Sequence, residues 1–232
     1  MTESSALPNG SDVTSITRTG GPENGGDTTQ VLKTLAGKGL SGSVLACIMA
    51  TKTRPYADRK FVALLHQQIR HEFTAHQQYV ALAVWFDSRD LPQLAKHFYA
   101  QSLEERQHAL MMVQYLLDRD VPVQIPAVDP VRNDFSEPKE LIQHALDQER
   151  RVTGEVEELF TVARDESDAM GEQFILWFLK EQVEEVAAMS TLLTVANRAG
   201  EQVFQIEDFL ARETVGDLGR DPLAPPVAGQ PR

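Results

Sequence analysis

Cysteine is almost absent from this chain of 232 residues. Cys47 stands alone, which excludes an internal disulfide and any zinc or iron–sulfur site that needs several cysteines. A single cysteine fits a reducing compartment, so we expect a cytoplasmic protein. Any metal site in the chain must therefore use His, Asp or Glu side chains.

Positive charge and long apolar runs are also scarce. The chain has 22 Lys and Arg residues against 34 Asp and Glu residues, a formal net charge of −12. That balance argues against a nucleic-acid partner held through phosphate contacts. The longest apolar run, Tyr79 to Phe86, is far shorter than the roughly 20 residues of a transmembrane helix. We therefore expect neither a nucleic-acid nor a membrane partner.

Glycine and proline divide the chain into three parts. Eight of the 14 glycines lie in residues 1–48, a polar stretch that buries too little apolar surface to offset the entropy of ordering. We expect a disordered N-terminal tail there, and Met49 is an alternative start of translation. Residues 49–213 form the predicted folded domain. Residues 214–232 contain four prolines and are expected to form a second disordered tail.

Long proline-free windows within the domain predict helices. The windows contain 36, 29 and 83 residues, and the last divides at Asp165–Asp168 and at Gly200. We predict four long helices and a short fifth, over residues 57–88, 91–118, 137–165, 168–199 and 202–213. Asp90 and Ser136 are candidate caps for the second and third helices. The segment 119–136 contains three prolines and is long enough to run the length of a bundle, so the predicted fold is an all-α four-helix bundle with a crossover between helices two and three.

Glutamate interrupts the apolar stripe of every long helix. Steps of three and four residues place on these inward stripes Glu72, Glu105, Glu149, Glu181 and Glu185. An unpaired buried carboxylate is strongly destabilising, and the four stripes contain no Lys or Arg. A pair of divalent cations would neutralise the carboxylates. His108 follows Glu105 by one helical turn and can converge with it on a metal, and oxygen ligands with one imidazole suit iron or manganese better than a structural zinc site.

At these residues the sequence resembles the non-haem bacterial ferritins, a branch of the ferritin-like di-iron carboxylate superfamily, and most of all the actinobacterial type. The resemblance covers about residues 57–213. It rests on helix lengths, crossover and short fifth helix, and on four segments: His71-Glu72-Phe73 with Tyr79, Glu104 to His108, Glu149, and Trp177 to Glu185. It implies a ferritin-like four-helix bundle.

The resemblance also implies a role for each site residue. Glu72, Glu105 and His108 would hold one iron, whereas Glu105, Glu149 and Glu185 would hold the second, with Glu105 bridging. Gln182 would sit beside the second iron, and Tyr79 matches a tyrosine near the di-iron centre. The extra carboxylates of a third iron site would be Glu104, Glu181 and Glu184.

The implied function is iron storage and detoxification. Such proteins oxidise Fe²⁺ to Fe³⁺ with O₂ or peroxide and deposit a ferric mineral inside a homo-oligomeric cage of 24 subunits. Bacterioferritins carry a haem-ligating methionine directly after the bridging glutamate, whereas this chain has Arg106, so we predict no haem. The segment Thr214 to Leu218 loosely resembles peptides that load cargo into encapsulin shells, which makes such a shell a further candidate partner.

Other interpretations remain open at this point. A di-iron oxidase or peroxidase of the rubrerythrin or oxygenase type uses similar carboxylates, although those relatives usually show two Glu-x-x-His motifs and this chain shows one. A helical interaction bundle would place the glutamates in solvent, but shifting the stripes by one residue would expose Phe98, Leu159 and Phe178 together. The three carboxylates of the implied third iron site can also be ordinary solvated charges, and Tyr79 can be an ordinary core aromatic.

Overall fold

The computed structural model describes residues 55–213, 215 and 221–230. The predicted N-terminal tail, Met49 and all but one residue of the candidate cargo segment lie outside these ranges. Within them the chain is helical and has no strand. The helices are the 3₁₀ turn η1 (Tyr56–Asp58) and the α-helices α3 (Lys60–Asp87), α4 (Pro92–Asp118), α5 (Pro138–Asp165), α6 (Ala169–Ala199) and α7 (Phe204–Arg212). This confirms the all-α prediction, and none of these helices combines the length and apolarity needed to cross a membrane.

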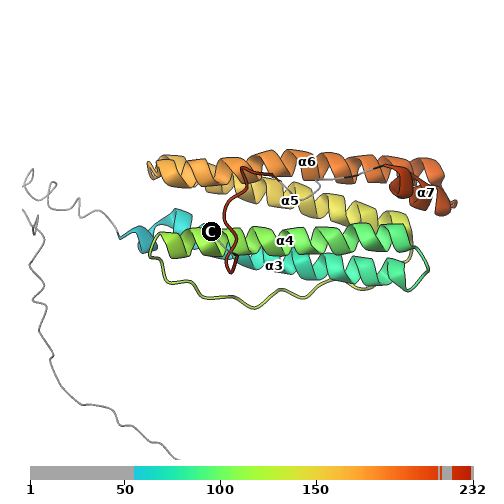
Figure 1. Ribbon diagram of the computed structural model, residues 1–232, viewed down its shortest axis with the longest axis horizontal. Coiled ribbons are helices and arrows are strands. Elements are labelled where there is room, and N and C mark those ends of the chain that lie inside the picture. The colour runs from blue at the N-terminus through green and yellow to red at the C-terminus, as the bar shows by residue number, and fades with distance from the viewer. Residues whose placement is uncertain (1–54, 214, 216–220, 231–232) are drawn as a thin grey trace, which may run out of the picture. The chain divides into compact units, whose positions relative to one another are not determined.

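The four long helices form a bundle of two pairs. Helix α3 packs mainly against α4, and α5 packs mainly against α6. The connection between α4 and α5 is an extended segment without regular secondary structure that runs along the bundle, whereas short turns join the helices within each pair (Figure 1). The predicted crossover is therefore confirmed. The short helix α7 folds back against α4 and α6 at one end of the bundle.

Two of the predicted helix ends are correct and two need correction. Asp168 caps α6 by accepting a hydrogen bond from the N–H of Gly171, and α6 ends where Gly200 adopts a positive φ of 59°. The predicted cap of α4 by Asp90 is wrong, because Asp90 itself lies in the left-handed region, at φ 56°, and Leu91 precedes the helix without a side-chain cap. Ser136 does not cap α5 either: its N–H and hydroxyl donate to Glu140.

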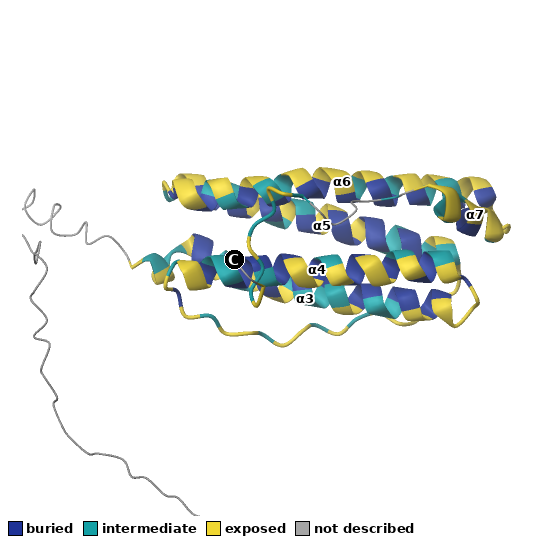
Figure 2. Cartoon of the chain, viewed as in Figure 1, coloured by how far each residue is buried: buried dark blue, intermediate teal, exposed yellow. Residues whose placement is uncertain are grey.

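The buried core consists of two apolar clusters with a polar layer between them. One cluster contains Leu94 and Phe98 together with residues of α3 and α6 at the end of the bundle near α7. The other cluster contains Phe61, Ile69 and Met112. Buried positions continue through the intervening turns of all four helices (Figure 2), but there most of them are polar. The members of this buried polar layer are Gln68, Glu72, Gln78, Gln101, Ser102, Glu105, His108, Gln148, Glu149, Glu181, Gln182 and Glu185.

Residues 221–230 lie across α4 and α6. The side chain of Asp221 accepts hydrogen bonds from Trp177 Nε1 at 3.0 Å and from Lys180 Nζ at 3.2 Å, and the N–H of Ala228 donates to the carbonyl of Leu110. Figure 1 shows this segment in dark red, passing from α6 over α4. The stretch that composition marks as a flexible tail thus contains a part with defined contacts on the bundle.

Candidate metal centre

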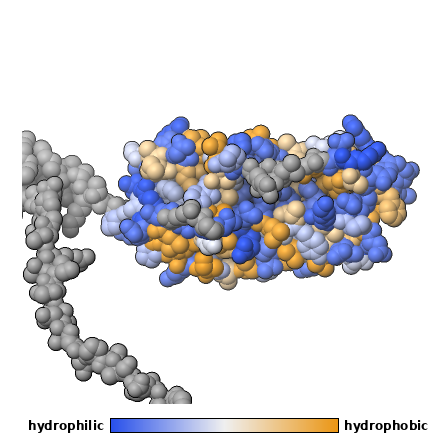
Figure 3. Space-filling view, viewed as in Figure 1, coloured by the Kyte–Doolittle hydropathy of each residue, from blue (hydrophilic) through white to orange (hydrophobic). Residues whose placement is uncertain are grey.

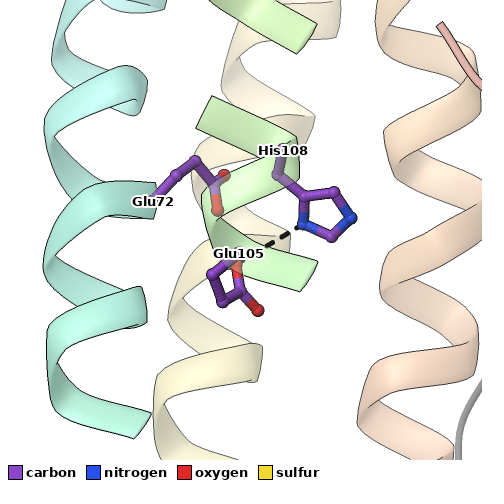
Figure 4. Close-up of side chains that lie close together, drawn as sticks. All are labelled: Glu72, Glu105 and His108. Carbon is purple, nitrogen blue, oxygen red and sulfur yellow. Dashed lines mark ion pairs between the residues drawn. The ribbon is translucent and has the colours of Figure 1, made fainter. Parts of the chain in front are cut away.

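The centre of the polar layer brings together three predicted ligands from two helices. Helix α3 contributes Glu72, and α4 contributes Glu105 and His108 one turn apart (Figure 4). All three side chains are buried, and one possible ligand atom from each lies within 4.8 Å of the others. His108 Nδ1 is 3.4 Å from Glu105 Oε2. A carboxylate–carboxylate–imidazole group of this kind can hold one divalent cation.

The other helix pair adds carboxylates to the same layer. Glu149 on α5 is fully buried and accepts a hydrogen bond from the Tyr79 hydroxyl of α3. Glu185 on α6 is 3% exposed, and its charge acts on Glu105, as does the charge of Glu149. We call Glu72, Glu105, His108, Glu149 and Glu185 the central cluster. The structure therefore places all five predicted di-iron ligands in one buried layer, with each of the four helices contributing.

The electrostatics of the central cluster are unfavourable without a cation. Burial raises the pKa values of Glu72, Glu105 and Glu185 well above the usual range, and neighbouring glutamate charges raise them further. For Glu149, burial outweighs the hydrogen bond from Tyr79 and raises the pKa to about 7. In all four carboxyl groups, loss of water and repulsion between like charges thus disfavour the charged form.

Several buried oxygens in the cluster lack hydrogen-bond partners. Within the described part of the chain they include Glu72 Oε2, both side-chain oxygens of Glu105, Glu149 Oε2 and Glu185 Oε2. Buried polar atoms are rarely left unsatisfied, and a bound ion or water is one of the ways in which such atoms find a partner. The donor set, carboxylates with one imidazole, is the one expected for iron or manganese. The residues present therefore fit the cations that the sequence predicts.

The predicted third-site carboxylates lie at the edge of this layer. Glu181 is buried, Glu104 is half-buried and Glu184 is exposed; we call these three residues the outer cluster. The Lys180 ammonium lies 3.5 Å from a carboxylate oxygen of Glu181 and 3.5 Å from one of Glu184. Gln182, predicted to sit beside the second iron, is buried and accepts a hydrogen bond from Thr153 at 3.0 Å.

A cavity of about 320 Å³ opens beside the cluster, between α4, α6 and residues 221–230. His108, Glu104 and Glu181 line its inner side, and Asp221, Pro225 and Val227 line the opposite side. The cavity thus touches both a central-cluster ligand and two outer-cluster carboxylates. Its lining mixes polar side chains with apolar ones such as Met111, Trp177 and Val227.

Sequence reasoning missed the residues that orient the ligands. Gln68 donates to Glu72 Oε1 at 2.9 Å, and the Thr153 hydroxyl contacts the side chain of Gln182 and the backbone carbonyl of Glu149. The rings of Trp177 and Phe178 each lie 5.7 Å, edge to face, from that of His108. Gln68 lies one helical turn before Glu72. A polar residue at this spacing from a predicted ligand could therefore have been identified from the sequence as a hydrogen-bond partner of that ligand.

The chain matches the ferritin-like domain family over residues 62–199. It is 64% identical over 172 residues to Ferritin BfrB of Mycolicibacterium smegmatis, an alignment that covers 74% of this chain and 94% of the relative. A more distant relative is the bacterial non-heme ferritin of Staphylococcus aureus, 33% identical over 143 residues, or 62% of this chain and 86% of the relative.

The fold has solved counterparts as well. An open pore ferritin from the hyperthermophilic archaeon Archaeoglobus fulgidus superposes with a TM-score of 0.64 at 27% sequence identity. The superposition covers 67% of this chain and 96% of the archaeal one. The family match over residues 62–199 covers the four long helices of the bundle, from the first turn of α3 to the end of α6.

Proposed function

Because the chain belongs to the ferritin family of iron-storage proteins, we propose that it is a ferroxidase that oxidises Fe²⁺ and stores the product as a ferric mineral. The observation that supports this proposal most directly is the central cluster, a buried set of carboxylates and one imidazole with unsatisfied oxygens. In each cycle two Fe²⁺ ions give up one electron each. The two electrons, with two protons, reduce O₂ to H₂O₂ or H₂O₂ to two molecules of water.

Each ligand has a separate task in this proposal. Glu72, Glu105 and His108 bind one Fe²⁺, whereas Glu105, Glu149 and Glu185 bind the second. Glu105 bridges the two ions, which is consistent with its two buried oxygens and their lack of hydrogen-bond partners. Carboxylates favour the more highly charged Fe³⁺, so binding itself assists the loss of an electron. Gln182 lies beside the second ion and Tyr79 holds Glu149 through its hydroxyl.

The outer cluster is proposed to bind a third iron on its way out. Glu104 and Glu181 line the cavity that also reaches His108, which supports a path between the two clusters. In the absence of iron, the Lys180 ammonium partly balances the charges of Glu181 and Glu184. A cation that arrives there replaces this contact, and the lysine keeps its ion pair with Asp221, which the structure shows at 3.2 Å.

Storage of a mineral requires a closed assembly, and we propose a homo-oligomeric cage of 24 chains in the cytoplasm. Apolar side chains exposed on the single chain support contacts between copies: Val84 on α3 is 52% exposed, Leu103 on α4 is 58% exposed, and Ile125 in the crossover is 63% exposed. Figure 3 shows apolar patches along the edge of the bundle where Figure 1 places α4 and the crossover. We propose no haem, because Arg106 follows the bridging glutamate, and an encapsulin shell stays a candidate partner.

The substitution Glu105→Ala tests the ferroxidase proposal. Loss of the bridging carboxylate removes one ligand from each iron, so we expect the rapid phase of aerobic Fe²⁺ oxidation to disappear in stopped-flow absorbance while the assembly persists. The matched control is Glu157→Ala, which removes an exposed carboxylate from α5 and should leave the rapid phase unchanged. An unchanged rapid phase in Glu105→Ala would show that Glu105 does not bridge the reacting ions.

A further inference from the structure

Met111 lines the cavity beside the metal centre, and the proposed function gives it no task. It lies on α4, one helical turn after His108, so the two side chains share a face of the helix. The cavity has a volume of about 320 Å³ and also reaches Glu104 and Glu181. The thioether of Met111 therefore shares one space with a predicted iron ligand and with two outer-cluster carboxylates.

The other methionines of the described helices have different surroundings. Met112 and Met189 are fully buried in the two apolar clusters, where no solvent reaches them. Met170 lies in the first turn of α6 and is 60% exposed, whereas Met111 is only 5% exposed. A reagent in bulk solvent therefore meets Met170 first, and it reaches Met111 chiefly through the cavity.

The sulfur of a thioether reacts with hydrogen peroxide by transfer of one oxygen atom. A sulfur lone pair attacks one peroxide oxygen, the O–O bond breaks, and the hydrogen on the transferred oxygen moves to the departing oxygen, which leaves as water. The sulfur loses two electrons and the peroxide gains them, so one thioether and one peroxide give one sulfoxide and one water. Reduction of O₂ by two Fe²⁺ ions at the central cluster supplies this peroxide.

We propose that Met111 is a site of methionine sulfoxide formation that intercepts hydrogen peroxide as it leaves the central cluster through the cavity. This inference rests on the proposed function, because the peroxide is made at the central cluster. Each Met111 side chain removes one peroxide until a reductase restores the thioether. The sulfoxide is polar, so oxidation also adds an oxygen acceptor to a wall that Trp177 and Val227 make partly apolar.

Peptide mass spectrometry of the full chain after aerobic turnover tests the proposal. The apo protein receives successive additions of Fe²⁺ in air, with catalase in the solution, and the sulfoxide fraction is measured at Met111 and at Met170. Catalase is too large to enter the cavity and destroys peroxide that reaches bulk solvent. We therefore expect sulfoxide to accumulate at Met111 while Met170 stays at the level of a sample without iron.

The reference experiment adds H₂O₂ directly to the iron-free protein. Met170 should then react about tenfold faster than Met111, in line with exposed fractions of 60% and 5%. Because peroxide made at the central cluster reverses this order, the ratio of Met111 sulfoxide to Met170 sulfoxide should be at least about tenfold higher after turnover than in the reference.

Met111→Leu and Met170→Leu form a matched pair of variants. Leucine keeps an apolar side chain of similar volume but cannot form a sulfoxide. Without catalase, Met111→Leu should release more H₂O₂ than the parent in the first turnovers, as measured with a peroxidase-coupled dye, whereas Met170→Leu should match the parent. Both variants should keep the rapid phase of Fe²⁺ oxidation, because neither side chain is assigned as a ligand.

The possible results separate this inference from the proposed function. A parent chain without rapid Fe²⁺ oxidation would overturn the ferroxidase centre, and the role of Met111 with it. Rapid oxidation with a sulfoxide ratio equal to that of the reference, or with parent-like peroxide release by Met111→Leu, would overturn only the role of Met111. Oxidation of Trp177, which lines the same cavity, in place of Met111 would also overturn that role, because it would indicate one-electron radical chemistry instead of oxygen transfer.

Discussion

At the scale of single residues, the buried carboxyl of Glu149 makes the stability of the apo protein depend on pH. Its pKa is about 7 in the folded chain, against 4.5 for an ordinary glutamate, because burial disfavours the charged form. Between these two pH values the folded state binds more protons than the unfolded state. The stability contributed by the protonated carboxyl is therefore lost as pH rises from about 4.5 to about 7.

The substitution Glu149→Gln should remove the part of this pH dependence that Glu149 contributes, while Glu72, Glu105 and Glu185 keep theirs. Glutamine keeps an acceptor for the Tyr79 hydroxyl but cannot ionise. We expect the variant to match the parent near pH 4.5 and to be more stable at pH 8 by up to about 3 kcal/mol. Thermal melts with a chelator present, at several pH values, measure the difference, and Glu157→Gln serves as the surface control. A difference that does not grow with pH would contradict the buried charge at Glu149.

At the scale of elements, the start of α4 depends on a carboxylate far away in the sequence. Glu207 on α7 is buried, and its two carboxylate oxygens accept hydrogen bonds from the backbone N–H groups of Gln93 and Leu94, each with an N···O distance of 2.8 Å. A carboxylate at this position satisfies two N–H groups that the helix itself leaves unpaired and interacts favourably with the helix dipole. The same contact attaches α7 to the bundle.

Glu207→Ala should therefore loosen both helices. We expect a loss of about 1–2 kcal/mol of stability, the usual cost of a lost helix cap. The amides of Gln93 and Leu94 should exchange hydrogen faster, as measured by NMR or mass spectrometry. Asp208→Ala on the same helix changes an exposed carboxylate and should leave these amides protected. Equal protection in the two variants would show that the cap does not hold α4.

At the scale of the whole molecule, local sequence patterns were enough to predict the helical bundle. They were not enough to predict contacts between residues that lie far apart in the sequence. Proline positions placed the helices within a few residues, and glutamates on apolar stripes predicted a layer that the structure indeed buries at Glu72, Glu105 and Glu149. The cap from Glu207 escaped prediction because its partners lie 113 and 114 residues away. Docking of residues 221–230 escaped it as well, because a proline-rich segment carries no periodicity that marks a buried face.

The assembled particle provides the decisive test of storage against simple redox catalysis. Size-exclusion chromatography with light scattering, before and after aerobic loading with Fe²⁺, gives the number of chains and the iron content of each particle. A storage protein should form a particle of about 24 chains and take up far more than two irons per chain, because a mineral grows beyond the ligands of the central cluster. A monomer or dimer that stops at about two irons per chain would keep the metal centre and move the function to oxidation of another substrate, as in the rubrerythrin and oxygenase types. The net charge of −12 per chain favours uptake of cations in either case, so only the capacity of the particle separates the two functions.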